Sequence, residues 1–530
     1  MPDYIIIGGG SAGCVLAARL TEDPAISVVL LEAGPRDTNP YIHVPVGFFK
    51  MTAGPLIWGY ETEPGQEIVG RRMVYPQARV LGGGSSINAQ VFTRGCPEDY
   101  DTWRDAEGCA GWGYGDVSSY FRKSEGNDTF GGEHHGNDGP LGVSAPAPHP
   151  LTRVFVRAAQ EAGLPFNADF NAGRQAGAGF YQSTTRAGRR SSTAVGYLRP
   201  AAGRPNLTVR TGVLVNRIVI ESGRAIGVEI IDQGRPVILR AEREVVVTSG
   251  AIGSPKLLML SGIGPADHLR GLGIDVVRDL PQVGQNLQDH MDVDVLAELS
   301  GSFGIDRYKK RRWQAVAALE YLMFRKGPVA SNIVEAGGFW WGDRSEATPD
   351  IQFHFLPGAG LEEGIGSVPG GHGCTLNSYH VRPRSRGTVT LRTADPRMAP
   401  AIDPNAFSDP YDLERAVDGI EMSQHILSQP AFRPFVRRLH LPDDTVRTRS
   451  DYAAFAREHA RSAYHPVGTC RMGGDAESVV DPTLKLRGIE GLRVCDSSVM
   501  PRLISSNTNA ATIMIAEKAA DLIKGVAPAA

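Results

Sequence analysis

Three glycines near the N-terminus have the spacing of a dinucleotide-binding turn. Gly8, Gly10 and Gly13 follow a short apolar run, and the residues after them have the pattern of a helix. The first glycine of such a turn permits a tight bend, the second lets the backbone approach a pyrophosphate, and the third lets helix and strand pack closely. Glu32 follows Gly13 by 19 positions, where an acidic side chain binds a pair of ribose hydroxyls. The sequence therefore predicts a dinucleotide site, which this motif alone does not assign to NAD or FAD.

Glycine is concentrated in further clusters along the chain. The sequence holds 63 glycines, roughly 12% of its residues against an average near 7%. The cluster at 78–88 combines three consecutive glycines, two serines and Asn88. Such a loop suits backbone that packs against a large flat cofactor, so it favours FAD. Three more distinctive segments lie at 250–264, 464–473 and 496–514, of which the last contains no glycine.

Taken in order, these five segments resemble those of the glucose–methanol–choline (GMC) family of flavoprotein oxidoreductases. The resemblance covers essentially the whole chain, and the clusters at 78–95 and 250–264 are similar to the family's two signature patterns at every constrained position. It implies FAD, a two-domain fold and the oxidation of an alcohol by hydride transfer to flavin N5. Some members attach the flavin through a histidine immediately before the asparagine of the second segment. Ile87 occupies that position here, so FAD is predicted to bind without a covalent link.

The resemblance also assigns parts of the cofactor to residues of this chain. The residues expected along the isoalloxazine are Val80, Gly84, Asn88 and Val91. The adenine end is expected at Val213, and the ribose or ribityl–pyrophosphate chain near Ala251 and Asp496. The complete predicted set of cofactor-binding residues is Gly8, Gly10, Ser11, Ala12, Gly13, Glu32, Ala33, Arg79, Val80, Gly83, Gly84, Asn88, Ala89, Gln90, Val91, Val213, Ala251, Tyr464, Asp496 and Ala510.

A histidine is the expected catalytic base, because its unperturbed pKa lies near the working pH and an alcohol must lose its hydroxyl proton as the hydride leaves. Of the 13 histidines, the resemblance singles out His465, in the segment Tyr-His-Pro-Val-Gly-Thr-Cys-Arg-Met-Gly. Asn509, 44 positions later, is the second catalytic candidate, because the family holds histidine or asparagine there, paired with the first histidine across the substrate hydroxyl. Asn509 also suits the N-cap of the helix that follows. Ala511 replaces a proline common in the family, and His290 is expected to be structural.

The predicted reaction is the FAD-dependent oxidation of a primary alcohol, aliphatic or aromatic, to the aldehyde. Segments 166–170 and 188–193 are similar to those of bacterial choline, aliphatic-alcohol and furfuryl-alcohol members. The electrons would pass to oxygen or to a quinone-type acceptor. The alternatives are two FAD-containing relatives, a hydroxynitrile lyase and a fatty-acid photodecarboxylase. A nicotinamide-dependent dehydrogenase would leave the later clusters unexplained. Choline would need a carboxylate or an aromatic cage for its ammonium group, and the sequence does not place one.

Composition and net charge limit the kinds of molecule that this protein is expected to bind. The chain has 55 Lys and Arg against 58 Asp and Glu, a net charge of −3, so no strong basic field exists for nucleic acid or an anionic membrane. No run of 18 apolar residues predicts an integral membrane segment, and no secretory signal is readable before the first apolar run, so a cytoplasmic location is expected. The six cysteines include no C-x-x-C pair and no zinc spacing, so no metal site is expected. Oligomeric state is left open.

The elements that must position these residues begin with a strand, a helix and a second strand. Tyr4–Ile7, Cys14–Leu20 and Ser27–Leu31 make one βαβ unit, which predicts a doubly wound parallel layer. The alternating pattern of 205–250 predicts a small antiparallel sheet, and Glu244–Thr248 is a buried strand that returns to the parallel layer.

The remaining pattern predicts a second, discontinuous domain. Residues 411–460 are expected to be mostly helical, and the chain ends with a strand at Leu492–Cys495 and a helix at Ala510–Ile523. The aromatic residues near 340 and 353–355 are core or pocket wall. The predicted fold class is α/β, with α+β character overall. A Rossmann-like FAD-binding domain comprises 1–150, 200–295 and 463–530, and a substrate-binding domain of antiparallel sheet and helices comprises 151–199 and 296–462.

Overall fold

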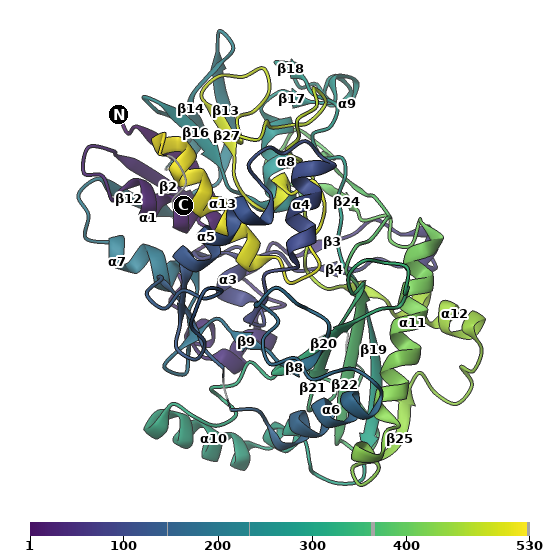
Figure 1. Cartoon of the computed structure of the whole chain (residues 1–530). Helices are drawn as coiled ribbons and strands as arrows, with labels where there is room; N and C mark the ends of the chain where they lie inside the picture. The colour runs from purple at the N-terminus through teal and green to yellow at the C-terminus, as the bar shows by residue number, and fades with distance from the viewer. Residues whose placement is uncertain (146, 233, 362–365, 527–530) are drawn as a thin grey trace.

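β1 (Tyr4–Ile7) is the centre of a five-stranded parallel sheet (Figure 1). The structure is a computed structural model that describes residues 1–145, 147–232, 234–361 and 366–526. β1 pairs with β2 (Val28–Glu32) and β16 (Glu244–Val247), and β12 (Leu207–Thr211) and β27 (Leu492–Val494) form the two edges. All four residues of β1 are buried, as expected of a continuous apolar run in a parallel sheet covered on both faces. The sheet brings the first, middle and last parts of the chain together beside the glycine turn.

Two helices from opposite ends of the chain lie side by side next to this sheet (Figure 1). α1 (Ser11–Leu20) starts three residues before the predicted helix, so Gly13 lies in its first turn, and it packs along α13 (Asn509–Lys524). The Arg19 guanidinium pairs with the fully buried Glu517 carboxylate at 2.8 Å, which joins the two helices. The packing places the start of α13 beside the start of α1.

The second large sheet has seven strands, and each of its pairings is antiparallel. Its strands are β8 (Gly177–Phe180), β19 (Met291–Leu299), β20 (Ala336–Trp340), β21 (Ile351–Leu356), β22 (Gly373–His380), β25 (Val436–Leu441) and β26 (Arg461–Ser462). α6 (Pro150–Glu161) and α11 (Pro410–Leu427) pack on this sheet, and their apolar side chains share one core with it. β19 crosses the predicted domain boundary at 295/296.

Two predicted segments differ in part from the structure. β13 (Val215–Glu221), β14 (Arg224–Asp232) and β15 (Arg235–Arg240) form the small antiparallel sheet, but β12 joins the parallel sheet instead. An edge strand needs only one covered face, so its alternating pattern fits either sheet. Within the segment predicted to be mostly helical, 436–441 is the edge strand β25, whose exposed arginines interrupt any apolar run.

Several further helices surround the sheets. They are α4 (Pro97–Asp105), α5 (Tyr114–Ser124), α8 (Gly250–Leu260), α9 (Ala266–Gly271), α10 (Arg311–Phe324) and α12 (Arg449–His459). Among the described residues, no helix has both the length and the apolar character that crossing a bilayer requires.

Candidate active site

The turn between β1 and α1 requires glycine at two positions and leaves open space at a third. Gly8 has φ +107°, and a Cβ there would lie 2.5 Å from the carbonyl oxygen of Thr248. A Cβ on Gly13 would lie 2.0 Å from the carbonyl oxygen of Gly8, so the close approach of helix and strand depends on it. A Cβ on Gly10 would meet nothing nearer than 3.8 Å. Gly8 thus serves the tight turn, Gly13 the close packing of helix and strand, and Gly10 the open side of a pocket, which are the three requirements of a dinucleotide-binding turn.

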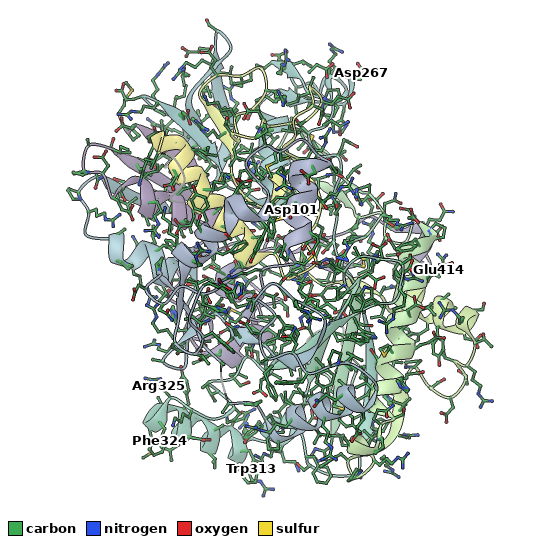
Figure 2. All side chains as sticks on the ribbon, in the orientation of Figure 1. Asp101, Asp267, Trp313, Phe324, Arg325 and Glu414 are labelled. Carbon is green, nitrogen blue, oxygen red and sulfur yellow. The ribbon has the colours of Figure 1, made fainter. Side chains whose placement is uncertain are left out.

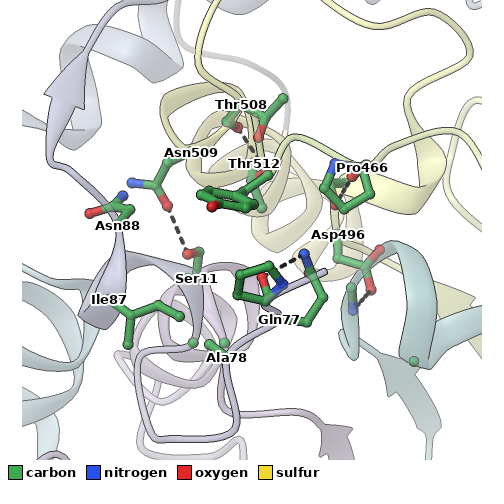
Figure 3. A pocket seen from close by; sticks show the side chains of 18 of the residues that line it. Ser11, Gln77, Ala78, Ile87, Asn88, Pro466, Asp496, Thr508, Asn509 and Thr512 are labelled. Atoms are coloured by element: carbon green, nitrogen blue, oxygen red, sulfur yellow. Dashed lines mark hydrogen bonds between the residues drawn. The ribbon is translucent and has the colours of Figure 1, made fainter. Parts of the chain in front are cut away.

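One large pocket lies at the carboxyl ends of the parallel strands. Gly8, Glu32, Ser249 and Asp496, which end or follow β1, β2, β16 and β27, all line it. Figure 3 shows Asp496 in this pocket. Open α/β sheets bind their ligands in such a crevice. The pocket continues past the start of α13 to the antiparallel sheet, where His354 and Tyr379 line it. The site is thus formed by both sheets.

Most of the predicted cofactor-binding residues line this pocket. They are Gly8, Gly10, Ser11, Ala12, Glu32, Ala33, Gly83, Gly84, Asn88, Ala89, Gln90, Val91, Val213, Tyr464 and Asp496. Five predicted residues lie outside the lining, namely Gly13, Arg79, Val80, Ala251 and Ala510. Packing explains two of them. Gly13 packs against the backbone of Gly8 and so does not face the pocket. Val80 is buried in an apolar cluster with Ile42, Met51 and Leu56.

The residues present fit a dinucleotide such as FAD. Gly84 and Gly250 line the pocket, and a Cβ on either would meet nothing within 4 Å, so bare backbone faces open space at both. The Glu32 carboxylate accepts the amide protons of Gly9 and Gly34 at 2.8 and 2.6 Å, which fixes it at the end of β2. Burial raises the pKa of both Glu32 and Asp496. A dinucleotide needs exposed backbone beside its phosphates and fixed carboxyl groups beside its ribose hydroxyls. The pocket offers both.

His465 lies in the pocket at the end of a chain of hydrogen bonds that fixes its tautomer. His290 Nε2 is 3.0 Å from the carbonyl oxygen of Val381, which can only accept, so this nitrogen carries a proton. Neutral His290 then accepts at Nδ1, which is 3.0 Å from Nδ1 of His465, and His465 must donate from that nitrogen. The lone pair of His465 is therefore on Nε2. His290, expected to be structural, is in direct contact with the predicted base.

Asn507 contacts the unprotonated nitrogen of His465. Its amide Nδ2 is 3.1 Å from His465 Nε2. Its Oδ1 accepts from the Thr93 hydroxyl and the Gln352 amide, each at 3.2 Å. Because these two donors hold the oxygen, the amide nitrogen must point at His465.

Asn509 faces another part of the same pocket, which corrects the sequence prediction. Its Oδ1 accepts from the Ser11 hydroxyl at 2.8 Å (Figure 3), so it does not pair with His465. The N-cap alternative also differs from the structure, because Thr508 occupies that position and Asn509 is the first helical residue. Asn507 precedes the helix, so the two side chains leave the backbone in different directions although two positions separate them.

A buried carboxylate holds the two histidines in place. Asp289 Oδ1 accepts the backbone amide protons of His290 and His465, each at 2.9 Å. Its Oδ2 accepts from the hydroxyls of Tyr75 and Ser462. Burial raises the pKa of Asp289 to about 6. The group orders the backbone on both sides of the histidine contact.

Burial also sets the charge of the histidines. It lowers the pKa of His465 to about 3 and that of His290 well below its ordinary value. Both rings are therefore neutral near pH 7, which the tautomer assignment requires. A neutral imidazole with its lone pair directed into a pocket can accept a proton.

The side chains of β21 alternate between the core and the pocket. Phe353 and Phe355 are buried in the core shared with α6 and α11, whereas His354 and Leu356 line the pocket. Successive side chains of a strand point to opposite faces, which resolves the open question about these aromatic residues. The ring of Tyr379, on the neighbouring β22, stacks on His290 with centroids 4.7 Å apart.

A paired carboxylate completes this wall. Asp292 Oδ2 is 2.9 Å from the Arg461 guanidinium and accepts from the Asn377 amide at 3.2 Å. All three residues line the pocket. The wall beside His465 therefore contains an aspartate paired with Arg461, and the same guanidinium also lies 3.3 Å from Asp294.

Two family models described as GMC oxidoreductase match residues 2–292 and 383–516. The chain belongs to the GMC oxidoreductase family. This GMC oxidoreductase is 42% identical to an alcohol dehydrogenase (acceptor) of Pseudomonas putida, over 99% of this chain and 96% of that protein. It is 43% identical to an oxygen-dependent choline dehydrogenase of Sinorhizobium medicae, over 100% of this chain and 96% of that protein. A solved structure of Aspergillus oryzae formate oxidase, studied for its FAD modification, has a TM-score of 0.93 and 27% identity, covering 99% of this chain and 98% of that one.

These similarities confirm the predicted family, the fold class and the FAD cofactor, and they identify this GMC oxidoreductase as an enzyme acting on CH–OH groups. Sequence reasoning missed the contacts of Asp289, Asn507, Thr93 and Gln352. Asn507 stands in the same glycine-poor, asparagine-rich cluster as Asn509, so the cluster itself was the available signal. Thr93 and Gln352 carry no local motif.

Proposed function

We propose that this enzyme oxidises a neutral primary alcohol to its aldehyde with His465 as the general base. The observation that carries the proposal is the tautomer chain, which leaves the lone pair of His465 on the nitrogen inside the pocket. FAD, when bound, supplies the acceptor for the hydride that leaves the alcohol carbon. His465 Nε2 takes the hydroxyl proton, so the C–H and O–H bonds break as the C=O bond forms.

The Asn507 amide supports this step without taking a proton. An uncharged amide is not a base at neutral pH. Its N–H donates to His465 Nε2 at 3.1 Å, and a substrate hydroxyl that displaces this contact can accept the amide N–H at its oxygen while its own proton points at Nε2. Thr93 and Gln352 hold the amide in that orientation. Asn507 thus takes over the positioning role that the sequence assigned to Asn509.

The charge balance beside His465 favours a neutral alcohol. An ammonium substrate gains most from an unbalanced carboxylate or an aromatic cage. The carboxylate that lines this wall of the pocket, Asp292, is instead paired with Arg461, which also contacts Asp294 outside the lining. Choline remains the second candidate, because Asp292 and Tyr379 both line the pocket and one relative is named for choline. An oxygen or quinone acceptor is part of the proposal and is tested separately.

The decisive experiment mixes the FAD-loaded enzyme, without oxygen, with aliphatic, aromatic and amino alcohols. A substrate bleaches the yellow flavin, and admission of air restores the colour rapidly if oxygen is the acceptor or slowly if a quinone is needed. Choline bleaching the flavin faster than every neutral alcohol would overturn the neutral-substrate assignment. A hydroxynitrile lyase, which the similarities do not favour, would stay yellow with every alcohol.

FAD is proposed to bind without a covalent link. Ile87 lines the pocket next to Asn88 (Figure 3) and offers no nucleophile. Acid precipitation of the loaded enzyme should leave a yellow supernatant and a colourless pellet. A yellow pellet would show a covalent bond and contradict the proposal.

A further inference from the structure

The helix α10 is apolar on the side that faces away from the protein. Val316, Leu319, Leu322, Met323 and Phe324 are each between 54% and 68% exposed. Among the described helices, no other has more than one large apolar side chain this exposed. Figure 2 shows the ends of the helix, with Trp313 at one and Phe324 at the other, along the lower edge of the molecule.

The opposite side of α10 already makes its contact with the protein. Ala317 and Tyr321 are buried and Trp313 is partly buried, and their spacing of four places them on one stripe. Val316, Leu319 and Met323 follow the other side at intervals of three and four. An exposed apolar stripe of this extent is typical of a surface that meets a protein or a membrane.

Basic side chains stand at both ends of this apolar surface. Lys310, Arg311 and Arg312 lie at its start, and Arg325 and Lys326 at its end, with Glu320 as the one acid between them. All five basic residues are exposed, and within the described part of the chain none of them forms an ion pair. The net charge of −3 for the whole chain therefore conceals a local cluster of positive charge.

We propose that α10 docks this enzyme on an anionic lipid bilayer. Helices that lie in the plane of a membrane surface bury an apolar face at the acyl boundary and place lysine and arginine among anionic headgroups. Long basic side chains can do so from the ends of the helix, because their stems extend along apolar surface while the charged groups stay in water. The net charge of the whole chain argues against an anionic membrane as partner, but the ends of α10 are locally basic.

A second copy of the chain fits the same surface less well. A symmetric dimer contact places the same patch of both subunits together, and here it would bring two sets of five basic residues into proximity. Charge complementarity therefore favours anionic lipid over self-association.

The docked surface would adjoin the substrate side of the pocket. η4 (Ile305–Lys309) directly precedes α10, and Ile305 belongs to an apolar cluster with Val91, Val334 and Leu356. Those three residues also line the pocket. The docking inference does not rest on the proposed reaction, and its test does not use catalysis.

Vesicle sedimentation with the FAD-loaded enzyme tests the proposal. The enzyme should sediment with vesicles of phosphatidylcholine and phosphatidylglycerol, much less with pure phosphatidylcholine, and less at high salt because salt screens the headgroup charge. Leu319→Glu with Leu322→Glu should lower the partition coefficient by tenfold or more. The matched control is Val237→Glu with Ile238→Glu on β15, which changes two exposed apolar side chains elsewhere and should bind as the parent does.

A second pair of variants tests the charge. Arg311→Glu with Arg312→Glu should weaken binding by at least about twentyfold, since each basic residue near such a surface contributes about fivefold. Arg235→Glu with Arg240→Glu should have no effect. Retained flavin colour shows that each variant is folded. Unchanged sedimentation of the α10 variants, or no binding by the parent enzyme, would overturn the proposal. So would a parent dimer that the leucine variant dissociates, because a second copy would then cover the face.

Discussion

The glycine turn after β1 and the wall around His465 belong to one pocket, but the turn presents backbone and the wall presents side chains. The turn uses six consecutive residues and presents backbone, with glycine required where a Cβ would meet a carbonyl. The wall uses side chains from distant segments: Asn507 lines the pocket, and Asp289 and Gln352, which lie outside the lining, hold His465 and Asn507 by hydrogen bonds. The turn works only if space is left open for the cofactor, and the wall works only if each hydrogen-bond donor faces the right acceptor. Substitutions in the turn should therefore affect cofactor and fold, and those in the wall should affect rate.

The largest effects on FAD content and stability are expected from two substitutions in the turn. One fills the space left for the cofactor, and the other disturbs the packing of helix against strand. Gly10→Val fills open space, so the protein should fold but purify almost without FAD. Gly13→Ala forces a Cβ against the carbonyl of Gly8, which should lower the free energy of unfolding by about 1–3 kcal/mol or more, as overpacking does. Flavin absorbance per protein and thermal unfolding without cofactor distinguish the two. A Gly10→Val enzyme with a full complement of FAD would contradict the assignment of that open space.

A rate effect without cofactor loss is expected at His465. His465→Ala should keep its yellow FAD and its melting temperature, yet oxidise alcohol about a thousandfold more slowly, within the usual range for general base catalysis. His425→Ala, an exposed position on α11, is the control and should behave as the parent. Anaerobic bleaching of the flavin by one good substrate measures both. A near-normal rate for His465→Ala would move the base to another group, with His354 the first to examine.

The pH dependence of the same rate follows from burial. The imidazolium form of His465 cannot accept a proton, and burial lowers its pKa to about 3. The neutral form therefore dominates from pH 5 upward, and the rate should change by less than about twofold between pH 5 and pH 8. A base with the ordinary pKa near 6.5 would lose about thirtyfold over that range, and such a loss would show that substrate and cofactor reverse the effect of burial.

The two asparagines of one segment offer a smaller and more selective contrast. Asn507→Ala removes the amide beside His465 Nε2 and should slow alcohol oxidation by roughly tenfold, the upper range for one hydrogen bond. Asn509→Ala removes only the contact with Ser11 and should slow it by less than about threefold. Comparison of kcat for the pair is the measurement. If Asn509→Ala were the slower enzyme, the sequence prediction would be restored over the geometry.

These contrasts also explain how far sequence reasoning could go. The roles of Gly8, Gly10 and Gly13 were predictable because a turn is local and each position has its own steric requirement. The fold class followed from strand and helix patterns, but β25 did not, since an edge strand with exposed arginines lacks an apolar signature. Asn507 and Asn509 are the same residue type in one cluster, and only the start of α13 decides which faces His465. The partners of Asn507 come from segments with no pattern linking them.

The finest test concerns His290, which acts on the reaction only through His465. Its Nδ1 accepts from His465, while its ring stacks on Tyr379. His290→Phe keeps a ring for stacking and removes the acceptor, so His465 can adopt either tautomer, and kcat should fall by about fivefold to tenfold with little change in KM. His290→Asn removes the ring but places an amide oxygen near the former Nδ1, so it should recover part of the lost kcat. A role in packing alone predicts the reverse order, because phenylalanine would then be the milder substitution. The ranking of the two variants, measured with one substrate at one pH, therefore decides whether the hydrogen-bond chain or the stacked ring is what the enzyme needs from this residue.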